Sequence, residues 1–279
     1  MKQLPFRAYS YSKNGKQRKG DVLINKRNED YKKVDIYRGI FITADGVGGY
    51  KEGRTASRHA TLLIYDDMKG IYTYIKEHRL EDKNALDILV ESVHDRNKYI
   101  YAWGKIPSAY RCGTTLDGMI IHSNKIFGVH VGDGTVYKID TKRNIITPLT
   151  TPDKGMLNGL DELTSLEKDI VDSNIVSNYI GQEKITVQSY LESMSSSDVI
   201  IMATDGFTKK VHSDEILHAF NNDNTNKNCF DAGIKNLKEL CRKPKMMAVL
   251  VNGLREKGYK VSSNIFYDDT TFIAIQKGD

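Results

Sequence analysis

Four aspartates, each beside an apolar run that indicates a strand, are the residues of this sequence best suited to chemistry. They are Asp45 in FITADGVGG, Asp133 in HVGDG, Asp205 in IIMATDG and Asp268 in NIFYDD. Acids at strand ends tend to converge at one edge of a sheet, and neighbouring glycines let the backbone turn tightly and approach a ligand closely. Carboxylate and carbonyl oxygens are the ligands that hard divalent cations prefer. The pattern therefore predicts a metal site at a sheet edge.

Such a group of acids needs a counter-charge. Two carboxylates about 4 Å apart repel each other by roughly 4 kcal/mol at an effective dielectric constant near 20. Two divalent ions about 3.5–4 Å apart would balance this charge and hold a bridging hydroxide. The alternative is that the four aspartates are unrelated turn residues. Because the same arrangement recurs four times, the sequence favours the metal site.

Other common catalytic arrangements fit the sequence poorly. A cysteine-dependent phosphatase needs an arginine six residues after its nucleophile, and that position after Cys112 is Gly118. The histidines form no H-E-x-x-H pair, and GVGGYKEG matches neither a dinucleotide-binding loop nor a Walker loop. No G-x-S-x-G elbow is present. Catalysis by metal ions that the aspartates bind therefore remains the best interpretation of the sequence.

The elements that must position the acids form strand-rich blocks interrupted by pairs of helices. We expect strands at Phe41–Asp45, Thr114–Ile121, Lys125–Gly132, Thr135–Asp140 and Val199–Ala203, and a hairpin-like pair within NIFYDDTTFIAI. We expect helices at Ser57–His78, Asn84–Trp103, Ser213–Phe220, Asp231–Leu240 and Lys245–Lys257. Short turns at His122–Asn124 and Asp133–Gly134 predict antiparallel neighbours. The pattern indicates a layered α+β architecture, and without a linker or repeat it predicts one domain over residues 1–279.

Composition describes an ordinary globular chain of 279 residues with a net charge of +5. Basic and aromatic residues do not interleave, so nucleic acid is not an expected partner. The N-terminus lacks the apolar region of a secretory signal, and no run is long enough to span a membrane. The three cysteines show no C-x-x-C spacing and indicate reduced thiols. We expect a cytoplasmic monomer that does not associate with membranes.

Six segments, in order, resemble the motifs of the metal-dependent PP2C (PPM) family of serine/threonine phosphatases, and the bacterial branch most closely. They are RNED (Arg27–Asp30), ADGVGGYKEGRTAS, CGTTLDGMII, VHVGDGTVYKI, MATDGFTKKV and YDDTTFIAI. The corresponding family motifs are N-E-D, D-G-x-G-G…G-x-x-A-S, G-T-T, G-D-S-R-x-Y, S-D-G-L/F-T and D-N/D-x-T. A single short motif is weak, but six in order cover nearly the whole chain.

This resemblance implies a four-layer α-β-β-α sandwich, two antiparallel sheets flanked by helices, with a dinuclear Mn²⁺ or Mg²⁺ site at one end. Asp45 then resembles the carboxylate that bridges both metals, and Gly46 would supply a backbone carbonyl. Asp205 and Asp268 would complete the opposing side. Asp30 resembles the family's early carboxylate, which binds a metal directly or through water.

The same resemblance also marks departures. Asp133 resembles a ligand for a third, weaker metal, but an acid often found four residues after the Asp205 position is here Lys209. The family's phosphate-binding arginine is replaced by Asn25, which leaves Lys26 or Arg27 to bind the phosphate. A lysine there lacks the bidentate geometry of arginine.

The resemblance and the acids together predict hydrolysis of phosphoserine or phosphothreonine in proteins that a serine/threonine kinase has modified. Asp45, Asp205 and Asp268 are the expected catalytic centre, with water activated by two metals. The departures motivate an alternative, a PP2C-like binding or regulatory protein with weakened catalysis. A two-metal phosphodiesterase or nuclease is a third reading, and only the mild basic charge supports it.

Overall fold

The structure, a computed structural model, describes residues 5–19, 22–25, 27–47, 52–106, 112–155, 163, 167, 176–221, 229–242, 245–259, 261 and 268–278. The strands are β1 (Phe6–Lys13), β2 (Lys16–Lys19), β3 (Val22–Asn25), β4 (Tyr31–Asp35), β5 (Ile40–Ala44), β6 (Leu116–His122), β7 (Lys125–Val131), β8 (Thr135–Asp140), β9 (Ile145–Pro148), β10 (Gln188–Ser193), β11 (Asp198–Ala203) and β12 (Thr270–Lys277). The helices are α1 (Gly53–Lys76), α2 (Asp82–Gly104), α4 (Asp205–Thr208), α5 (Ser213–Asn221), α6 (Cys229–Arg242) and α7 (Lys245–Glu256).

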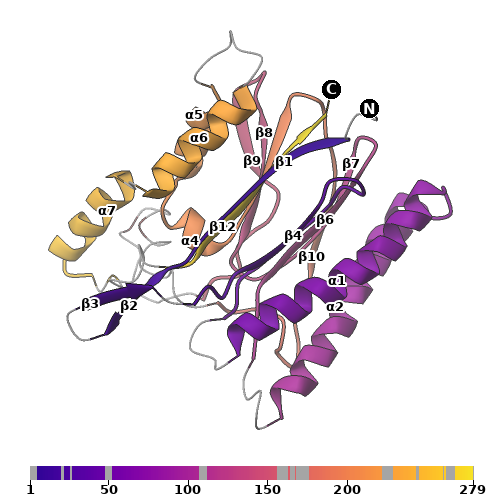
Figure 1. The fold of residues 1–279 in the computed structure, drawn as a ribbon, viewed down its shortest axis with the longest axis horizontal. Helices are drawn as coiled ribbons and strands as arrows, with labels where there is room; N and C mark the ends of the chain where they lie inside the picture. The colour runs from indigo at the N-terminus through magenta and orange to yellow at the C-terminus, as the bar shows by residue number, and fades with distance from the viewer. Residues whose placement is uncertain are drawn as a thin grey trace.

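Ten of these strands form two five-stranded sheets, and β2 and β3 form a separate hairpin. The first sheet has the order β1-β12-β11-β8-β9 and the second β10-β7-β6-β5-β4, with antiparallel neighbours throughout. Helices α1 and α2 cover the outer face of the second sheet, and α5 and α6 cover that of the first (Figure 1). The predicted α+β sandwich of two antiparallel sheets flanked by helices is confirmed.

Three apolar layers separate these four layers of structure, and they explain the uninterrupted apolar runs of the central strands. In β5, Ile40 and Ile42 pack under α1 and α2, whereas Phe41 packs between the two sheets. In β11, Ile201 packs toward α5 and α6, whereas Ile200 faces the other sheet. Successive side chains of a strand point to opposite faces, so a strand that is covered on both faces must be apolar at every position.

The long helices follow the predicted apolar spacing. Helix α1 begins at Gly53 rather than Ser57, and it buries residues at helical intervals, among them Ala56, Ala60, Ile64 and Met68. The bounds of α2, α5, α6 and α7 lie close to those predicted. Helices α1, α2, α5 and α6 are amphipathic, and each packs its apolar face against a sheet.

The prediction that Asp133–Gly134 joins antiparallel neighbours is wrong. Strand β7 belongs to the second sheet, whereas β8 lies in the first, where it pairs with β11 and β9. Gly132 has φ of 115°, a conformation that few residues other than glycine adopt, and a Cβ there would overlap Thr115. The chain therefore crosses between the sheets at this turn. The other predicted turn, His122–Asn124, does join an antiparallel pair, β6 and β7.

Two other expectations about strand ends need correction. Strand β11 ends at Ala203, and Asp205 is the first residue of the short helix α4. Near the C-terminus the described residues form one strand, β12, which lies between β1 and β11 instead of folding back as a hairpin. The first arm of the expected hairpin, at residues 264–267, lies outside the described residues. Within 150–190, residues 156–162, 164–166 and 168–175 also lie outside them.

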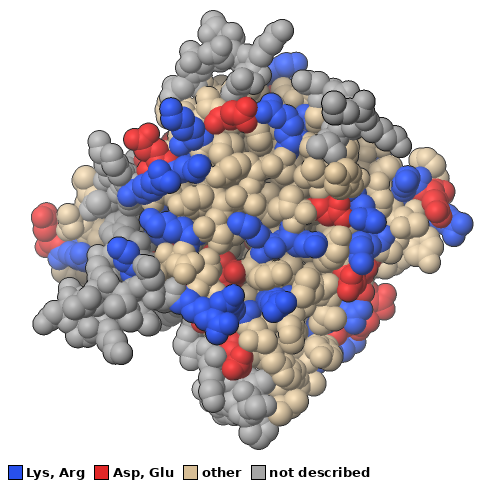
Figure 2. Space-filling model, in the orientation of Figure 1, with Lys and Arg blue, Asp and Glu red and all other residues tan. Residues whose placement is uncertain are grey.

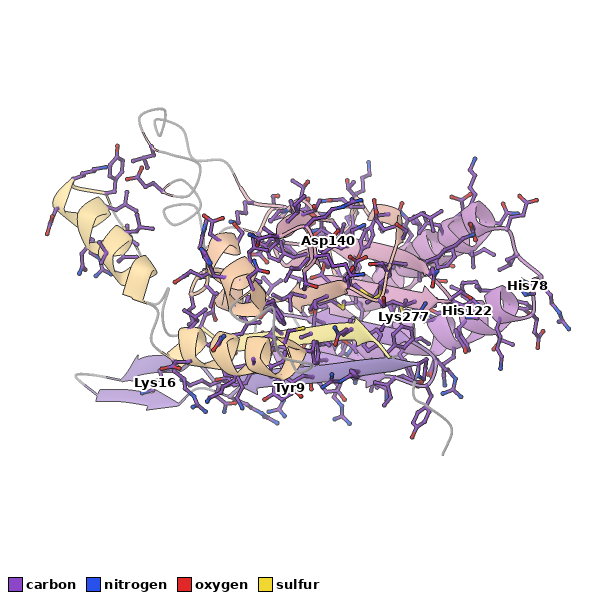
Figure 3. The ribbon with its side chains drawn as sticks, turned by 90° about the horizontal axis from the view of Figure 1, so that it is seen from above. Tyr9, Lys16, His78, His122, Asp140 and Lys277 are labelled. Atoms are coloured by element: carbon purple, nitrogen blue, oxygen red, sulfur yellow. The ribbon has the colours of Figure 1, made fainter. Side chains whose placement is uncertain are left out.

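Strand directions define two ends of the sandwich. The strands β6 and β12 finish near His122 and Lys277, which Figure 3 places at the end away from Lys16 and the β2–β3 hairpin. On the face that carries β1 and β4, Lys and Arg side chains predominate across the middle (Figure 2).

Within the described part of the chain, no helix is both long enough and apolar enough to cross a membrane.

Candidate metal centre

Five aspartates adjoin strand ends at one end of the sandwich, opposite the ends of β6 at His122 and of β12 at Lys277. Figure 3 labels His122 and Lys277 at the other end. Since β4 and β5 are antiparallel, Asp30 before β4 lies at the same end as Asp45 after β5. Since β11 and β12 are antiparallel, Asp205 after β11 lies at the same end as Asp268 before β12. Asp133 lies in the crossing between the sheets. The topology therefore gathers acids that the sequence separates widely.

Asp45 is held in place by the segment that precedes β6. Its N–H donates to Thr115 Oγ1 at 2.9 Å. Its carbonyl oxygen accepts from the Thr115 N–H at 2.8 Å and from Thr114 Oγ1 at 2.8 Å. These bonds hold the backbone of Asp45 in place, and none of them uses its carboxylate. The Gly-Thr-Thr segment of the sequence thus positions Asp45.

Thr204 joins the two sheets beneath the acids. Its Oγ1 donates to Asp30 Oδ2 at 3.1 Å and accepts the N–H of Thr271 at 3.1 Å. Its own N–H donates to the Thr271 carbonyl at 3.0 Å. The sequence analysis did not single out this residue, and the only signal for it was its place directly before Asp205.

The two neighbouring acids before β12 differ in what they contact. Asp269 is fully buried, and its carboxylate accepts the N–H of Gly15 at 2.6 Å and that of Glu29 at 2.9 Å. Asp268 instead forms an ion pair within the acidic cluster. Asp269 therefore ties the β1–β2 turn to the segment that leads into Asp30. The sequence alone did not separate these two roles.

The five carboxylates act on one another electrostatically. Burial raises the pKa of Asp45 well above its usual value, and the charges of Asp30, Asp205, Asp268 and Asp133 raise it further. Burial likewise raises the pKa of Asp133, with Asp205 as the next contribution. The pKa of Asp30 rises to about 7, again chiefly through burial. Buried like charges of this kind disfavour ionisation unless a cation is close.

One cation of the chain lies inside this cluster. The Lys209 ammonium forms ion pairs with Asp205 Oδ2 and, at 3.2 Å, with Asp268 Oδ2. Lys209 follows α4, and its N–H donates to the Asp205 carbonyl at 2.8 Å, so the two side chains lie on one side of this turn. Burial would lower the pKa of Lys209, but the carboxylates outweigh that effect and raise it.

The donor set fits a hard divalent cation in its chemistry. Asp30 Oδ1 and Asp205 Oδ1 are buried, and neither has a hydrogen-bond partner in the structure. Uncompensated buried carboxylate oxygens are costly, and a cation would satisfy them. Yet no three His, Cys, Asp or Glu side chains among the described residues are grouped so that they could hold one ion as they stand. The acids are gathered, and two of them are engaged by Lys209.

The structure describes only part of the segment that is expected to bind the phosphate. Arg27 is exposed, in the segment between β3 and Asp30. Lys26 lies outside the described residues, and nothing is described of the side chain of Asn25, the last residue of β3. Gly46 follows Asp45, and its N–H donates to the Glu29 carbonyl at 3.2 Å. The roles assigned to these residues stay predictions.

Comparison with known proteins gives a consistent picture. Residues 24–255 match the sequence model of the family described as Protein phosphatase 2C. The Serine/threonine phosphatase stp of Listeria monocytogenes serotype 4b (strain F2365) is 25% identical over 203 residues, which are 71% of this chain and 74% of that protein.

Two solved structures share the fold. One, described as a bacterial serine phosphatase, has a TM-score of 0.71 at 20% identity and covers 98% of this chain and 99% of its own. The other, the catalytic domain of the serine threonine protein phosphatase PstP in complex with 2 manganese ions, has a TM-score of 0.66 at 19% identity, over 98% of this chain and 99% of its own. At these identities the likeness concerns the fold.

Proposed function

The chain belongs to the protein phosphatase 2C family, and on that premise we propose that it hydrolyses phosphoserine and phosphothreonine in proteins with the help of divalent metal ions. Family membership makes it an enzyme of the protein serine/threonine phosphatase class. The observation that carries the proposal is the meeting of five buried or half-buried aspartates from both sheets at one end of the sandwich. We take residues 1–279 as one phosphatase domain.

Mn²⁺ or Mg²⁺ would be held chiefly by Asp45, Asp205 and Asp268 in this proposal. Asp30 would contribute directly or through water, and the carbonyl of Gly46 would add a neutral oxygen. Two such ions, when bound, would lower the pKa of a water molecule so that it attacks phosphorus near neutral pH. Asp133 is the proposed ligand of a third ion. The uncompensated oxygens of Asp30 and Asp205 support this assignment.

The residues of the chain itself have two further tasks. Thr114, Thr115 and Thr204 fix the main chain around the acids, which keeps the donors in place before a ligand arrives. Lys26 or Arg27 would neutralise the charge that spreads over the phosphoryl oxygens. The substrates would be phosphoproteins produced by a serine/threonine kinase, with the protein acting as a monomer.

The test is hydrolysis of a phosphothreonine peptide by the full chain with Mn²⁺, with and without EDTA. Chelation should abolish hydrolysis. The substitution Asp45→Asn should lower kcat/KM by about 100-fold or more, since even partners behind the metal ligands contribute about 10–100-fold. Asp95→Asn is the matched control, because Asp95 is exposed on α2 and pairs only with Lys98 in the described structure. Equal rates in all conditions would exclude the proposal.

A second candidate is a PP2C-like binding or regulatory protein with weakened catalysis. The ion pairs of Lys209 with two of the expected ligands favour it, as does Asn25 in place of an arginine. Calorimetric titration with Mn²⁺ discriminates between the two, because a decayed centre should bind no metal. A protein that binds no Mn²⁺ and releases no phosphate from the phosphothreonine peptide would support the second candidate.

A further inference from the structure

We propose that Lys209 is an internal cation that competes with divalent metal ions for Asp205 and Asp268 and thereby weakens the affinity of the centre for metal. This inference rests on the proposed function, because it concerns the same carboxylates. Metal binding would then require the ammonium to leave the cluster. Lys209 would set the metal concentration at which the protein becomes loaded.

The contacts of Lys209 support this role. Its Nζ touches two carboxylates from different parts of the chain, Oδ2 of Asp205 and Oδ2 of Asp268. Its side chain is only 9% exposed, so it is not a surface charge that happens to point this way. Carboxylate oxygens that are held by an ammonium are not open to a metal ion in the same geometry. This agrees with the absence, among the described residues, of a ready set of three ligands.

Lys209 does not satisfy every carboxylate oxygen of the cluster. While Oδ2 of Asp205 is paired with Lys209, Oδ1 of the same carboxylate is buried without a partner, as is Oδ1 of Asp30. One ammonium therefore leaves part of the negative charge uncompensated. A divalent ion carries twice the charge of the ammonium, and it can bind several of these oxygens at once. The ion should therefore be able to displace Lys209, at a cost in affinity.

The neighbouring lysine provides an internal comparison. Lys210 is similarly buried, but its Nζ binds the main-chain carbonyl of Asp268 at 2.9 Å and the hydroxyl of Thr270. It fastens α4 to the start of β12 and engages no carboxylate oxygen by hydrogen bond or ion pair in the described structure. Removal of either lysine deletes one buried positive charge. Only removal of Lys209 frees carboxylate oxygens that a metal could use.

The experiment measures Mn²⁺ affinity by calorimetry, and the melting temperature in EDTA, for the full chain and for Lys209→Gln, Lys209→Arg and Lys210→Gln. For Lys209→Gln we expect Mn²⁺ to bind roughly tenfold or more tightly, because a nearby like charge is removed from a partly buried site. The metal-free melting temperature should fall, because Asp205 and Asp268 lose their counter-charge. Lys209→Arg should keep the wild-type affinity.

The two readouts move in opposite directions only if Lys209 competes with the metal. If Lys209→Gln lowers both stability and Mn²⁺ affinity, as a purely structural residue would, the inference is wrong. It is also wrong if Lys210→Gln tightens Mn²⁺ binding as much as Lys209→Gln. Should Lys209→Gln fold only with Mn²⁺, its metal content under increasing EDTA is compared with that of the wild type. Greater retention supports the inference and equal or lower retention overturns it.

Failure of this inference can be told apart from failure of the proposed function. A wild-type protein that binds Mn²⁺ and hydrolyses phosphopeptide, with no change in affinity in Lys209→Gln, refutes the competition alone. If neither protein binds Mn²⁺ and the wild type is inactive, both proposals fall.

Discussion

Replacement of Asp117 by leucine should destabilise the protein, because the buried side chain of His130 would lose its counter-charge. Asp117 and His130 are direct cross-strand partners in β6 and β7, and Asp117 Oδ1 lies 2.6 Å from His130 Nδ1. Their side chains are 2% and 0% exposed. His130 Nε2 is also buried and has no hydrogen-bond partner in the structure. Without Asp117, Nδ1 of His130 would lose this bond and Nε2 would still lack a partner.

The size of the effect follows from burial. Removal of one partner of a buried ion pair costs about 3–5 kcal/mol. For a chain of this size each kcal/mol shifts the melting temperature by about 2–4 °C, so Asp117→Leu should melt roughly 6–20 °C below the wild type. The double variant Asp117→Leu/His130→Leu should recover most of this loss, because apolar residues often replace a buried pair at little cost.

The pH dependence gives an independent check. Burial would lower the pKa of His130, but its attraction to Asp117 outweighs this and raises it. A histidine whose pKa is higher in the folded state contributes stability that is complete below its unfolded pKa, near 6.5, and is lost as the pH rises through the folded value. The stability of the wild type relative to the double variant should therefore decline as the pH rises above about 6.5 and through the raised pKa of His130.

The assay is urea and thermal unfolding of the metal-free full chain at several pH values, with the two single variants and the double variant as a cycle. A strong coupling between the two positions is expected. The reasoning is refuted if Asp117→Leu costs less than about 1 kcal/mol, the ordinary effect of a substitution. Simple addition of the two single effects in the double variant would refute it equally.

Other predictions test other parts of the structure. Gly206→Ala should prevent normal folding, because its Cβ would lie 1.7 Å from the Asp269 carbonyl oxygen, and a strong fall in the melting temperature would confirm this. Gly70→Ala in α1 meets no atom within 4 Å and should stabilise the helix by about 0.5–1 kcal/mol in urea unfolding. Tyr65→Phe removes the 2.8 Å bond to Asp35 Oδ2, at a cost of about 1 kcal/mol at neutral pH. Burial acts to raise the pKa of Asp35, but Tyr65 and Arg38 outweigh it and lower it, so the difference between wild type and Tyr65→Phe should shrink as unfolding is measured at increasingly acid pH.

The parts of the fold that sequence predicted well are those with strong local signals. The apolar run before Asp45 forms β5, and the apolar spacing after Ser57 forms most of α1. Such patterns depend on which face of one element is covered, and a single segment carries that information. The convergence of the acids also followed from sequence, because antiparallel strands bring the end of one strand beside the start of the next.

The parts that sequence missed depend on contacts between distant segments. The crossing at Asp133 looks locally like a hairpin turn, and only the sheet that accepts β8 shows that it is not one. Lys209 drew notice as a departure from a family pattern, but its ion pairs depend on where Asp268 lies in space. Thr204 contacts Asp30 from 174 positions away in the chain. No local pattern encodes such partners.

The charge of Asp117 belongs with those of the acids at this end of the sandwich. A Cβ on Gly134, next to Asp133, would lie 2.3 Å from Asp117 Oδ2. If Asp117 had no counter-charge, it would add another buried negative charge near carboxylates that already repel one another. His130 pairs with Asp117, and Lys209 pairs with Asp205 and Asp268. The chain thus supplies two of its own cations to a region dense in carboxylates, and the charge that remains is what a divalent ion would meet. A substitution at either cation should therefore alter metal affinity, but only Lys209 does so by direct contact with the expected ligands.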